Sequence, residues 1–422
     1  MKRPLRVLVI AQYYPPDMGG GATRAYNAVK GLLLHGARVT VVAARPHYPH
    51  GNVPKEYRWK PLKIEWHEGV KVVRTFVPPL PSVGLAYRLV LFLSFALSSL
   101  FALPAVGKVD VVWAANPNII SFFPAMVYGL LLRAPVALNV DDLWPEDMYS
   151  FNLLKPGSFL ARVAEALARI AYHKAKAITP ISPGYTLVIC SRYRVDARKV
   201  KVVESGVDTS KFKPCPTGRR KGKFTVLYIG AFSVAYDFEQ VLQAAKILEG
   251  ENVEIVLHGG GELAPLIKKR VKELNLTNVK VYDKILPREE VAKLLCEADA
   301  LLLPLRDFGR PYLGISSKLY EYQASGKPVV CHASGLPALY VEATKSGIVV
   351  KPGNPKALAE AVLLLMQNPQ LAEKLGSSGR RFIEKELIIE NIGRKIYELL
   401  IEVCEKTSRK MIYENKNLKK YI

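Results

Sequence analysis

The sequence predicts an α/β protein with two domains, each built on a parallel sheet. The chain has 422 residues, half of them hydrophobic, which is enough for two cores. Short runs rich in Val, Ile and Leu recur along it with helical segments between them, a pattern typical of parallel sheets joined by right-handed crossovers. A basic stretch broken by Pro and Gly, KFKPCPTGRRKGK, separates the runs into two sets and marks the linker.

The strand-like runs place the domain boundaries. We expect two Rossmann-like domains facing each other across a cleft, with residues 1–210 in the first, 211–223 as the linker and 224–389 in the second. A helix at 390–404 is expected to pack back onto the first domain, before a basic tail at 405–422. The expected strands are 6–14, 38–45, 70–77, 110–115, 136–140, 177–181 and 200–204 in the first domain, and 224–230, 253–258, 279–282, 300–305, 328–331 and 348–350 in the second.

The charge and the cysteines limit the class of partner. The formal net charge is +23, which suits nucleic acid, an anionic membrane or phosphorylated substrates. No recognition-helix motif or aromatic stacking platform is evident, so we expect no nucleic-acid partner. The five cysteines are scattered and form no CxxC pair, so we expect no disulfide framework, no zinc site and a reducing cytoplasm. The first residues, MKRPLRVLVIAQYYPP, are typical of a strand and not of a signal peptide.

An apolar segment, LAYRLVLFLSFALSSLFAL at 85–103, is nearly as long as the roughly 20 residues of a membrane span. A span here would place strands of one sheet on opposite sides of the bilayer, so we expect a crossover helix. This helix is either buried between the sheet and its neighbours, or exposes a second apolar face that inserts shallowly into an anionic bilayer. We favour the second reading, a cytoplasmic enzyme that is peripheral (monotopic) on the inner face of the cell membrane.

The most informative stretch lies in the second domain. After the buried run 301–305 comes a loop, and Ser316 or Ser317 then caps a helix at 318–325. The carboxyl end of a parallel strand followed by a helix N-terminus is an anion-binding arrangement. Glu321 follows Ser317 by one helical turn, within reach of a ribose if a diphosphate binds at the helix start. The alternative is that Ser317 is only a cap and Glu321 only a solvated carboxylate.

Weaker signals follow other strands. Gly19, Gly20 and Gly21 form a glycine turn after the first strand, which lets a ligand approach the backbone but is often only a tight connection. Asp142 follows the fifth strand, where a carboxylate can bind sugar hydroxyls or simply cap a helix. Gly230 ends the first strand of the second domain.

Taken in order, these segments resemble retaining glycosyltransferases of the GT-B fold, family 4, and most closely the bacterial and archaeal polysaccharide enzymes of the colanic-acid and N-acetylfucosamine transferase type. The resemblance runs from the N-terminus to about residue 386. It is carried by YYPPDMGGGATR, VVAARPHYPHGNV, VDDLWPEDM, AKAITPISPGY, ESGVDTSKF, GGGELAPLIKK, KLYEYQASGKPVV and SGIVVKPGNPKALAEAV.

The resemblance implies a hexosyl- or N-acetylhexosaminyl transferase that retains the anomeric configuration. It implies a nucleotide-sugar donor in the second domain, a UDP-sugar before a GDP-sugar, and a lipid-linked or glycan acceptor in the first. It implies no metal and no cofactor, and a role in cell-surface polysaccharide or glycoconjugate assembly.

The resemblance also assigns residues to the donor. Three are expected to act in catalysis: Asp142 near the sugar, Lys318 at the diphosphate and Glu321 at the ribose. The other donor-binding residues are Gly19, Gly20 and Gly21 near the reacting phosphate, Ser316 and Ser317 at the diphosphate, Gly230 at the strand end, and Lys284, Ile285 and Leu286 against the base.

The chain departs from the family in two places. Leu313 stands where a second glutamate is usual, and AFSVAYD at 231–237 lacks the Arg and Lys that many relatives carry there. We therefore expect Lys318, with Arg306 or Arg310, to neutralise the diphosphate.

Catalysis in this family is viewed as a front-face reaction that depends on positioning and on stabilising the leaving group. Two alternatives remain open. One is a nucleotide-sugar 2-epimerase of the same fold, and the other is a non-enzymatic protein whose basic surface binds a membrane or nucleic acid.

Overall fold

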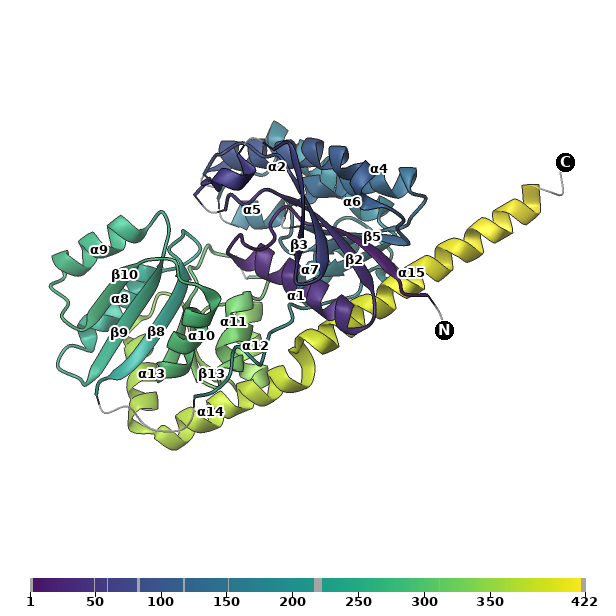
Figure 1. The fold of residues 1–422 in the computed structure, drawn as a ribbon. Coiled ribbons are helices and arrows are strands. Elements are labelled where there is room, and N and C mark those ends of the chain that lie inside the picture. The colour runs from purple at the N-terminus through teal and green to yellow at the C-terminus, as the bar shows by residue number, and fades with distance from the viewer. Residues whose placement is uncertain are drawn as a thin grey trace. The chain divides into compact units, whose positions relative to one another are not determined.

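The computed structural model describes residues 3–48, 50–58, 60–81, 84–116, 118–150, 152–215, 222–310 and 312–418. Residues 216–221 of the expected linker and 419–422 of the expected tail lie outside these ranges. The chain divides into two compact units (Figure 1). Unit 1 contains Met1–Gly206 and Ile389–Ile422, and unit 2 contains Val207–Ile388.

Unit 1 is built on a sheet that has seven strands in its described part, in the order β3-β4-β2-β1-β5-β6-β7. Neighbouring strands are parallel except for β3, which pairs antiparallel with β4. The strands are β1 (Arg6–Ile10), β2 (Arg38–Ala44), β3 (Leu62–His67), β4 (Val70–Thr75), β5 (Val111–Asn116), β6 (Val136–Val140) and β7 (Ala177–Pro180).

Two features of this sheet differ from the expectation. The segment 200–204 was expected to be a strand, but it contributes only an isolated bridge between Val200 and Ile178. Strand β3 was not expected, because it lies at the sheet edge and none of its residues is buried. A strand buried on both faces of a sheet appears in the sequence as a continuous apolar run, whereas an exposed edge strand such as β3 does not.

Helices cover both faces of the unit 1 sheet. Helices α1 (Gly20–Leu34) and α15 (Ile389–Leu418) lie together on one face, and α2 (Leu85–Ser99) and α4 (Phe122–Leu131) lie on the other (Figure 1). Helices α1 and α15 meet at Gly31 and Gly393, where a Cβ on Gly31 would come within 2.6 Å of the Gly393 Cα. The remaining α-helices are α3 (Leu103–Val106), α5 (Glu146–Ser150), α6 (Phe159–Lys174) and α7 (Pro183–Ser191).

Unit 2 is built on a six-stranded, wholly parallel sheet in its described part, in the order β10-β9-β8-β11-β12-β13. All six expected strands are present: β8 (Phe224–Ala231), β9 (Val253–Gly260), β10 (Val279–Asp283), β11 (Ala300–Pro304), β12 (Val329–His332) and β13 (Gly347–Val350). Its α-helices are α8 (Phe238–Ile247), α9 (Ala264–Glu273), α10 (Arg288–Glu297), α11 (Ser317–Ala324), α12 (Leu336–Thr344), α13 (Pro355–Gln367) and α14 (Pro369–Phe382).

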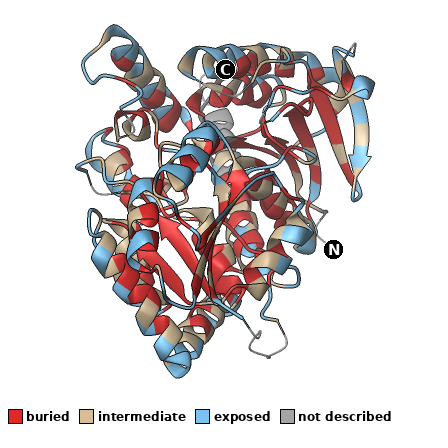
Figure 2. Ribbon diagram, turned by 90° about the vertical axis from the view of Figure 1, so that its left-hand side faces the viewer, coloured by how far each residue is buried: buried red, intermediate tan, exposed pale blue. Residues whose placement is uncertain are grey.

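The two sheets share one strand order once β3 is set aside. In each, the order reverses beside the unit's first strand, between β1 and β5 in unit 1 and between β8 and β11 in unit 2. Both sheets are lined with buried residues (Figure 2), so these strands form the two cores. Ligands of doubly wound sheets bind at the carboxyl ends of the strands where the order reverses. The fold therefore directs attention to the residues that follow β1, β5, β8 and β11.

The described residues contain one disulfide that the sequence analysis did not predict, although it expected no disulfide framework. Cys215 is bonded to Cys296 at the end of α10, with Cα atoms 5.3 Å apart, whereas Cys190, Cys331 and Cys404 are free thiols. The two bonded residues are 81 positions apart in sequence, so no local motif could show the pair. The bond attaches the segment that opens unit 2 to α10.

Candidate active site

Glycines line the carboxyl ends of β8 and β9. A Cβ on Gly259 would collide with the Gly230 carbonyl oxygen, and a Cβ on Gly261 would come within 2.6 Å of the Phe232 oxygen. These three glycines have φ of +147° (Gly230), +156° (Gly259) and +147° (Gly261), which side chains rarely adopt. Only glycine lets these two backbones approach so closely at this edge of the sheet.

The side chain of Lys318 lies across this edge. Lys318 extends from the first turn of α11, and its Nζ donates a hydrogen bond of 2.8 Å to the Tyr236 hydroxyl. The ammonium lies 4.6 Å from the ring centroid of Tyr236 and 5.5 Å from that of Tyr228, distances typical of cation–π contacts. A Cβ on Gly230 would collide with the end of the Lys318 side chain. The structure thus brings together Gly230 and Lys318, two of the predicted donor residues.

Helix α11 begins where the sequence indicates. Ser316 occupies the N-cap position in an extended conformation, but its side chain makes no capping hydrogen bond. Ser317 is the first helical residue. Ser316 therefore occupies the expected cap position, but its side chain does not form the capping hydrogen bond. A helix start carries free amides and a partial positive charge, both of which attract anions.

Glu321 lies one turn further along α11 and is bound by an arginine that the sequence analysis missed. The Arg288 guanidinium pairs with both carboxylate oxygens, Nη2 with Oε1 and Nη1 with Oε2, the second pair at 3.3 Å. The Arg288 Cζ lies 4.8 Å from the ring centroid of Phe212. Glu321 is therefore not a freely solvated carboxylate.

The turn predicted to face the base lies between β10 and α10. Lys284 and Ile285 are exposed, and Leu286 is buried. Next to this turn, His258 at the end of β9 stacks on Tyr282 with ring centroids 5.4 Å apart, and burial lowers the pKa of His258. An exposed apolar side chain beside a stacked pair suits a planar base.

The loop after β11 carries the two candidate arginines. The Arg306 amide donates to the Ala235 carbonyl at 3.0 Å, and the Tyr312 hydroxyl donates to the carbonyls of Ala235 and Arg306. These bonds fix the start of the loop beside Tyr236. Arg306 is half-buried there, whereas Arg310 lies in the exposed part of the loop.

In unit 1, the glycine turn and Asp142 follow β1 and β6. Gly19 is the N-cap of α1 with φ +116°, and a Cβ there would come within 2.8 Å of the Tyr48 ring. Asp142 is exposed beside the carboxylates of Asp147 and Asp141. Partial loss of hydration, and then these like charges, raise the pKa of Asp142.

A buried ion pair that sequence reasoning did not identify lies next to Asp142. Arg24 of α1 pairs with Asp141, and its Nη2 donates to the Asn139 side chain at 2.9 Å and to the Val203 carbonyl at 2.8 Å. All three polar side chains are buried. The pair joins α1, the helix after the glycine turn, to the end of β6. The position of Arg24 at the end of the GGGATR segment was the one sequence feature that pointed to a role for this arginine.

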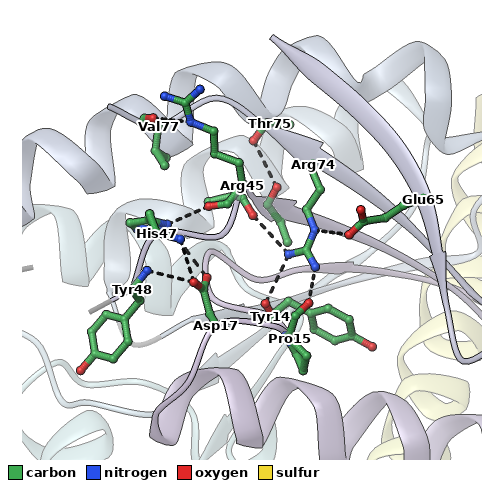
Figure 3. A network of polar contacts seen from close by, with 12 residues as sticks. Tyr14, Pro15, Asp17, Arg45, His47, Tyr48, Glu65, Arg74, Thr75 and Val77 are labelled. Carbon is green, nitrogen blue, oxygen red and sulfur yellow. Dashed lines mark hydrogen bonds and ion pairs between the residues drawn. The ribbon is translucent and has the colours of Figure 1, made fainter. Parts of the chain in front are cut away.

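A second polar network surrounds the residues just before the glycine turn (Figure 3). Asp17 Oδ1 accepts the backbone amides of His47 and Tyr48 at 2.8 and 2.9 Å. The Arg74 guanidinium donates to the Tyr14 and Pro15 carbonyls and pairs with Glu65 at 2.7 Å. Buried charges are stable only when they are paired in this way. The network fixes the chain leading into α1.

The structure therefore gathers Gly230, Lys318 and the start of α11 at one edge of unit 2, with Glu321 on the same helix, and it places Gly19–Gly21 and Asp142 in unit 1. Within the described residues, no group of three or more His, Cys, Asp or Glu side chains could hold a metal ion.

Comparison with known protein families matches both units. The Glycosyltransferase Family 4 model matches residues 18–211, and the Glycosyl transferases group 1 model matches residues 210–382. WcaI of Escherichia coli K12, a glycosyl transferase named for colanic acid biosynthesis, is 24% identical over 411 residues, covering 93% of this chain and 98% of its own. The GDP-mannose-dependent alpha-(1-6)-phosphatidylinositol monomannoside mannosyltransferase of Mycolicibacterium smegmatis is 25% identical over 410 residues, with coverage of 93% and 98%.

Solved structures share the fold. Sucrose-phosphate synthase from Thermosynechococcus elongatus aligns with a TM-score of 0.73 and 18% identity, covering 94% of this chain and 99% of its own. Anabaena Alr3699/HepE in complex with UDP-glucose aligns with a TM-score of 0.68 and 16% identity, with coverage of 94% and 100%. The predicted fold class is confirmed. The chain belongs to the GT-B glycosyltransferases, with a Glycosyltransferase Family 4 domain in its first half and a Glycosyl transferases group 1 domain in its second.

Proposed function

We propose that this glycosyltransferase transfers a hexosyl or N-acetylhexosaminyl group, with retention, from a UDP-sugar to a lipid-linked or glycan acceptor in polysaccharide assembly. A GDP-sugar is the second candidate donor. Unit 2 binds the donor, unit 1 binds the acceptor, and neither a metal nor a cofactor takes part.

The observation that carries this proposal is the arrangement at the strand-order reversal of unit 2. There the glycine edge, the Lys318 ammonium and the start of α11 adjoin one another, and Glu321 follows one turn later. A nucleoside diphosphate has the matching chemistry, because its phosphates need amides and a cation while its ribose needs a carboxylate.

The same arrangement supports a role in the chemical step. When the glycosidic bond to the diphosphate breaks, negative charge develops on the phosphate oxygens. Lys318 and the α11 amides stabilise that charge without moving, because Tyr236 already holds the ammonium. Asp142, with its raised pKa, is suited to hold a proton and to donate a hydrogen bond to a sugar hydroxyl.

Relatives support the choice of donor and pathway. The Anabaena structure contains UDP-glucose, and the mycobacterial relative is named for GDP-mannose, so both bases occur among proteins similar to this chain. WcaI is named for colanic acid biosynthesis, which favours a polysaccharide product.

We further propose that unit 1 rests on an anionic membrane surface, at the inner face of the cell membrane. In the described part of the chain, Leu85–Val106 is the helical stretch long and apolar enough to cross a membrane, but only a third of its most apolar window is buried. Phe101, and Phe159 on α6, are 78% and 79% exposed. Exposed apolar side chains continue on three helices: Leu93 and Leu97 on α2, Leu130 and Leu131 on α4, and Leu160 and Val163 on α6.

Exposed cations lie on or next to two of these helices. Arg133 follows α4, and Arg162 and Arg169 are exposed on α6. Each basic residue near an anionic bilayer contributes about 1 kcal/mol to binding. Helices that carry both exposed apolar side chains and cations are typical of proteins that lie on a membrane without crossing it.

A calorimetric panel of UDP, GDP and ADP tests the donor proposal. We expect UDP to bind most tightly and its UDP-sugar to be consumed with release of UDP only when a lipid-linked or glycan acceptor is present. Release of UDP together with a modified free sugar, without acceptor, would indicate a 2-epimerase. Absence of binding by all three nucleotides would contradict the proposal.

A further inference from the structure

We propose that Arg288 is a positioning residue for the donor ribose, acting by orienting the carboxylate of Glu321. The inference rests on the proposed function, since it concerns the same nucleotide site. It assigns a role to a residue outside the motif that carries Glu321, on a different helix.

The geometry of the pair favours orientation over simple charge neutralisation. The two terminal guanidinium nitrogens, Nη1 and Nη2, face different carboxylate oxygens, so Arg288 holds Glu321 at two points. The Glu321 side chain is 14% exposed and the Arg288 side chain 34% exposed. A two-point contact at a partly buried site fixes the rotation of the carboxylate, which a single lysine contact would not do.

The ion pair leaves hydrogen-bond acceptor positions on the Glu321 carboxylate for a ligand. A carboxylate offers about four acceptor positions, and Arg288 occupies one on each oxygen. The remaining positions suffice for two ribose hydroxyls. Arg288 can therefore hold Glu321 while Glu321 holds the sugar, and the ligand need not displace it.

Arg288 is itself held in place by the first residues of unit 2. Its guanidinium lies over the buried ring of Phe212 at 4.8 Å. On the same helix, Glu289 pairs with Lys211 at 2.7 Å, and Cys296 is bonded to Cys215. Three contacts thus fix α10 to the segment 211–215.

Arg288 also follows the turn proposed for the base by a single residue, Pro287. The base turn 284–286 and the ribose carboxylate are therefore connected through one short stretch of backbone. We infer that Arg288 sets the distance between base and ribose subsites, and that its loss weakens recognition of the ribose diol in particular.

The test compares the dissociation constants of UDP and 2′,3′-dideoxy-UDP by calorimetry, with the GDP pair in parallel. The measured quantity is the dissociation constant of the dideoxy nucleotide divided by that of UDP, which isolates the hydroxyls. We expect Glu321→Gln to reduce this ratio about tenfold. Arg288→Gln and Arg288→Ala should reduce it by a similar factor, and Arg288→Lys by less.

Glu289→Gln is the matched control, because it breaks only an exposed ion pair with Lys211 on the same helix and does not touch Glu321, while the Phe212 contact and the disulfide still hold α10. We expect it to keep the ratio of the wild type. A purely structural role of Arg288 would weaken both nucleotides equally, so an unchanged or larger ratio in Arg288→Gln, at an unchanged melting temperature, overturns the inference. If wild-type protein binds none of the nucleotides, the proposed function fails and the inference fails with it. If Glu321→Gln lowers the ratio and Arg288→Gln does not, only the inference fails.

Discussion

The side chain of Lys318 occupies the space that a Cβ at position 230 would need. Gly230 is the last residue but one of β8 and Lys318 is the second residue of α11, so two positions 88 apart in sequence constrain each other directly. Any side chain at 230 would displace the ammonium from Tyr236. The glycine therefore provides the place in which the cation is held.

The first prediction concerns this cation. Lys318→Ala should lower kcat at least about tenfold, equivalent to about 1.4 kcal/mol of transition-state stabilisation, with a smaller effect on donor binding. The reason is that charge on the diphosphate grows as the bond breaks. Lys318→Arg should recover part of the activity, and Lys356→Ala at the exposed start of α13 should be neutral. Near-normal turnover in Lys318→Ala would assign the role to Arg306 or Arg310.

The second prediction follows from the contact between the two residues. Gly230→Ala should lower kcat as Lys318→Ala does, and the double variant should be no worse than the more damaging single variant, because both remove one interaction. Gly222→Ala is a matched control, since Gly222 has φ +154° and no atom of the described residues lies within 4 Å of the place its Cβ would take. It shares the backbone strain without the collision. If the losses of kcat in the two single variants add up in the double variant, Gly230 and Lys318 act independently and the prediction is wrong.

The sequence predicted the fold well because both sheets depend on buried, apolar parallel strands, which local patterns reveal. It predicted the helix that carries Lys318 and Glu321 for the same reason, since a strand, a loop and a helix follow one another there. The sequence could not show that Arg288 binds Glu321 or that Tyr236 binds Lys318, because each contact joins separate elements. Such pairs are set by tertiary packing.

The third prediction concerns the ribose. Glu321→Gln keeps the shape of the side chain but removes its charge, so the free energy of UDP binding should weaken by about 1.5–3 kcal/mol. Calorimetry measures the loss directly. The unfolding temperature serves as the control, since Arg288 is left without its partner in this variant. An unchanged dissociation constant for both UDP and GDP would remove Glu321 from the donor site.

The fourth prediction concerns the apolar surface. The double change Leu93→Ser and Phe101→Ser replaces exposed side chains of the apolar stretch and should release the protein from anionic vesicles in a flotation assay, with nucleotide affinity intact. Leu266→Ser on α9 of unit 2 removes a similarly exposed leucine and should leave vesicle binding unchanged. Loss of folding in the double variant would show instead that these residues belong to the core.

The polar networks of unit 1 were harder to predict than the helix start at Lys318 in unit 2. His47 and Arg74 stand in strands or loops far from Asp17 in sequence, and the sheet alone brings them together (Figure 3). The segment VVAARPHYPHGNV resembles the family, but no local pattern in it shows that His47 is buried. Burial of a polar ring depends on partners that only the folded chain supplies.

The last prediction uses this buried histidine. His47 is 2% exposed, its Nδ1 lies 2.9 Å from the Arg45 carbonyl, and burial lowers its pKa to about 4. A carbonyl only accepts, so Nδ1 carries a proton, and the lowered pKa keeps the ring neutral above about pH 4. An unfolded histidine binds a proton near pH 6.5, so between pH 6.5 and 4 the unfolded chain gains protons before the folded chain does.

The stability that His47 contributes is therefore complete above pH 6.5 and is lost as the pH falls toward 4, by about 3 kcal/mol at most. Asp17 changes stability in the opposite direction, because burial raises its pKa to about 6 and the folded chain therefore binds its proton first as the pH falls. The pH dependence of the wild-type protein alone therefore does not show the contribution of His47. His47→Asn removes only the imidazole and leaves the backbone amide that binds Asp17. We expect urea unfolding to show that this variant is less stable than the wild type at pH 8, and that the difference shrinks steadily between pH 6.5 and 4. Parallel stability curves for the two proteins over that range would mean that His47 titrates normally in the folded state.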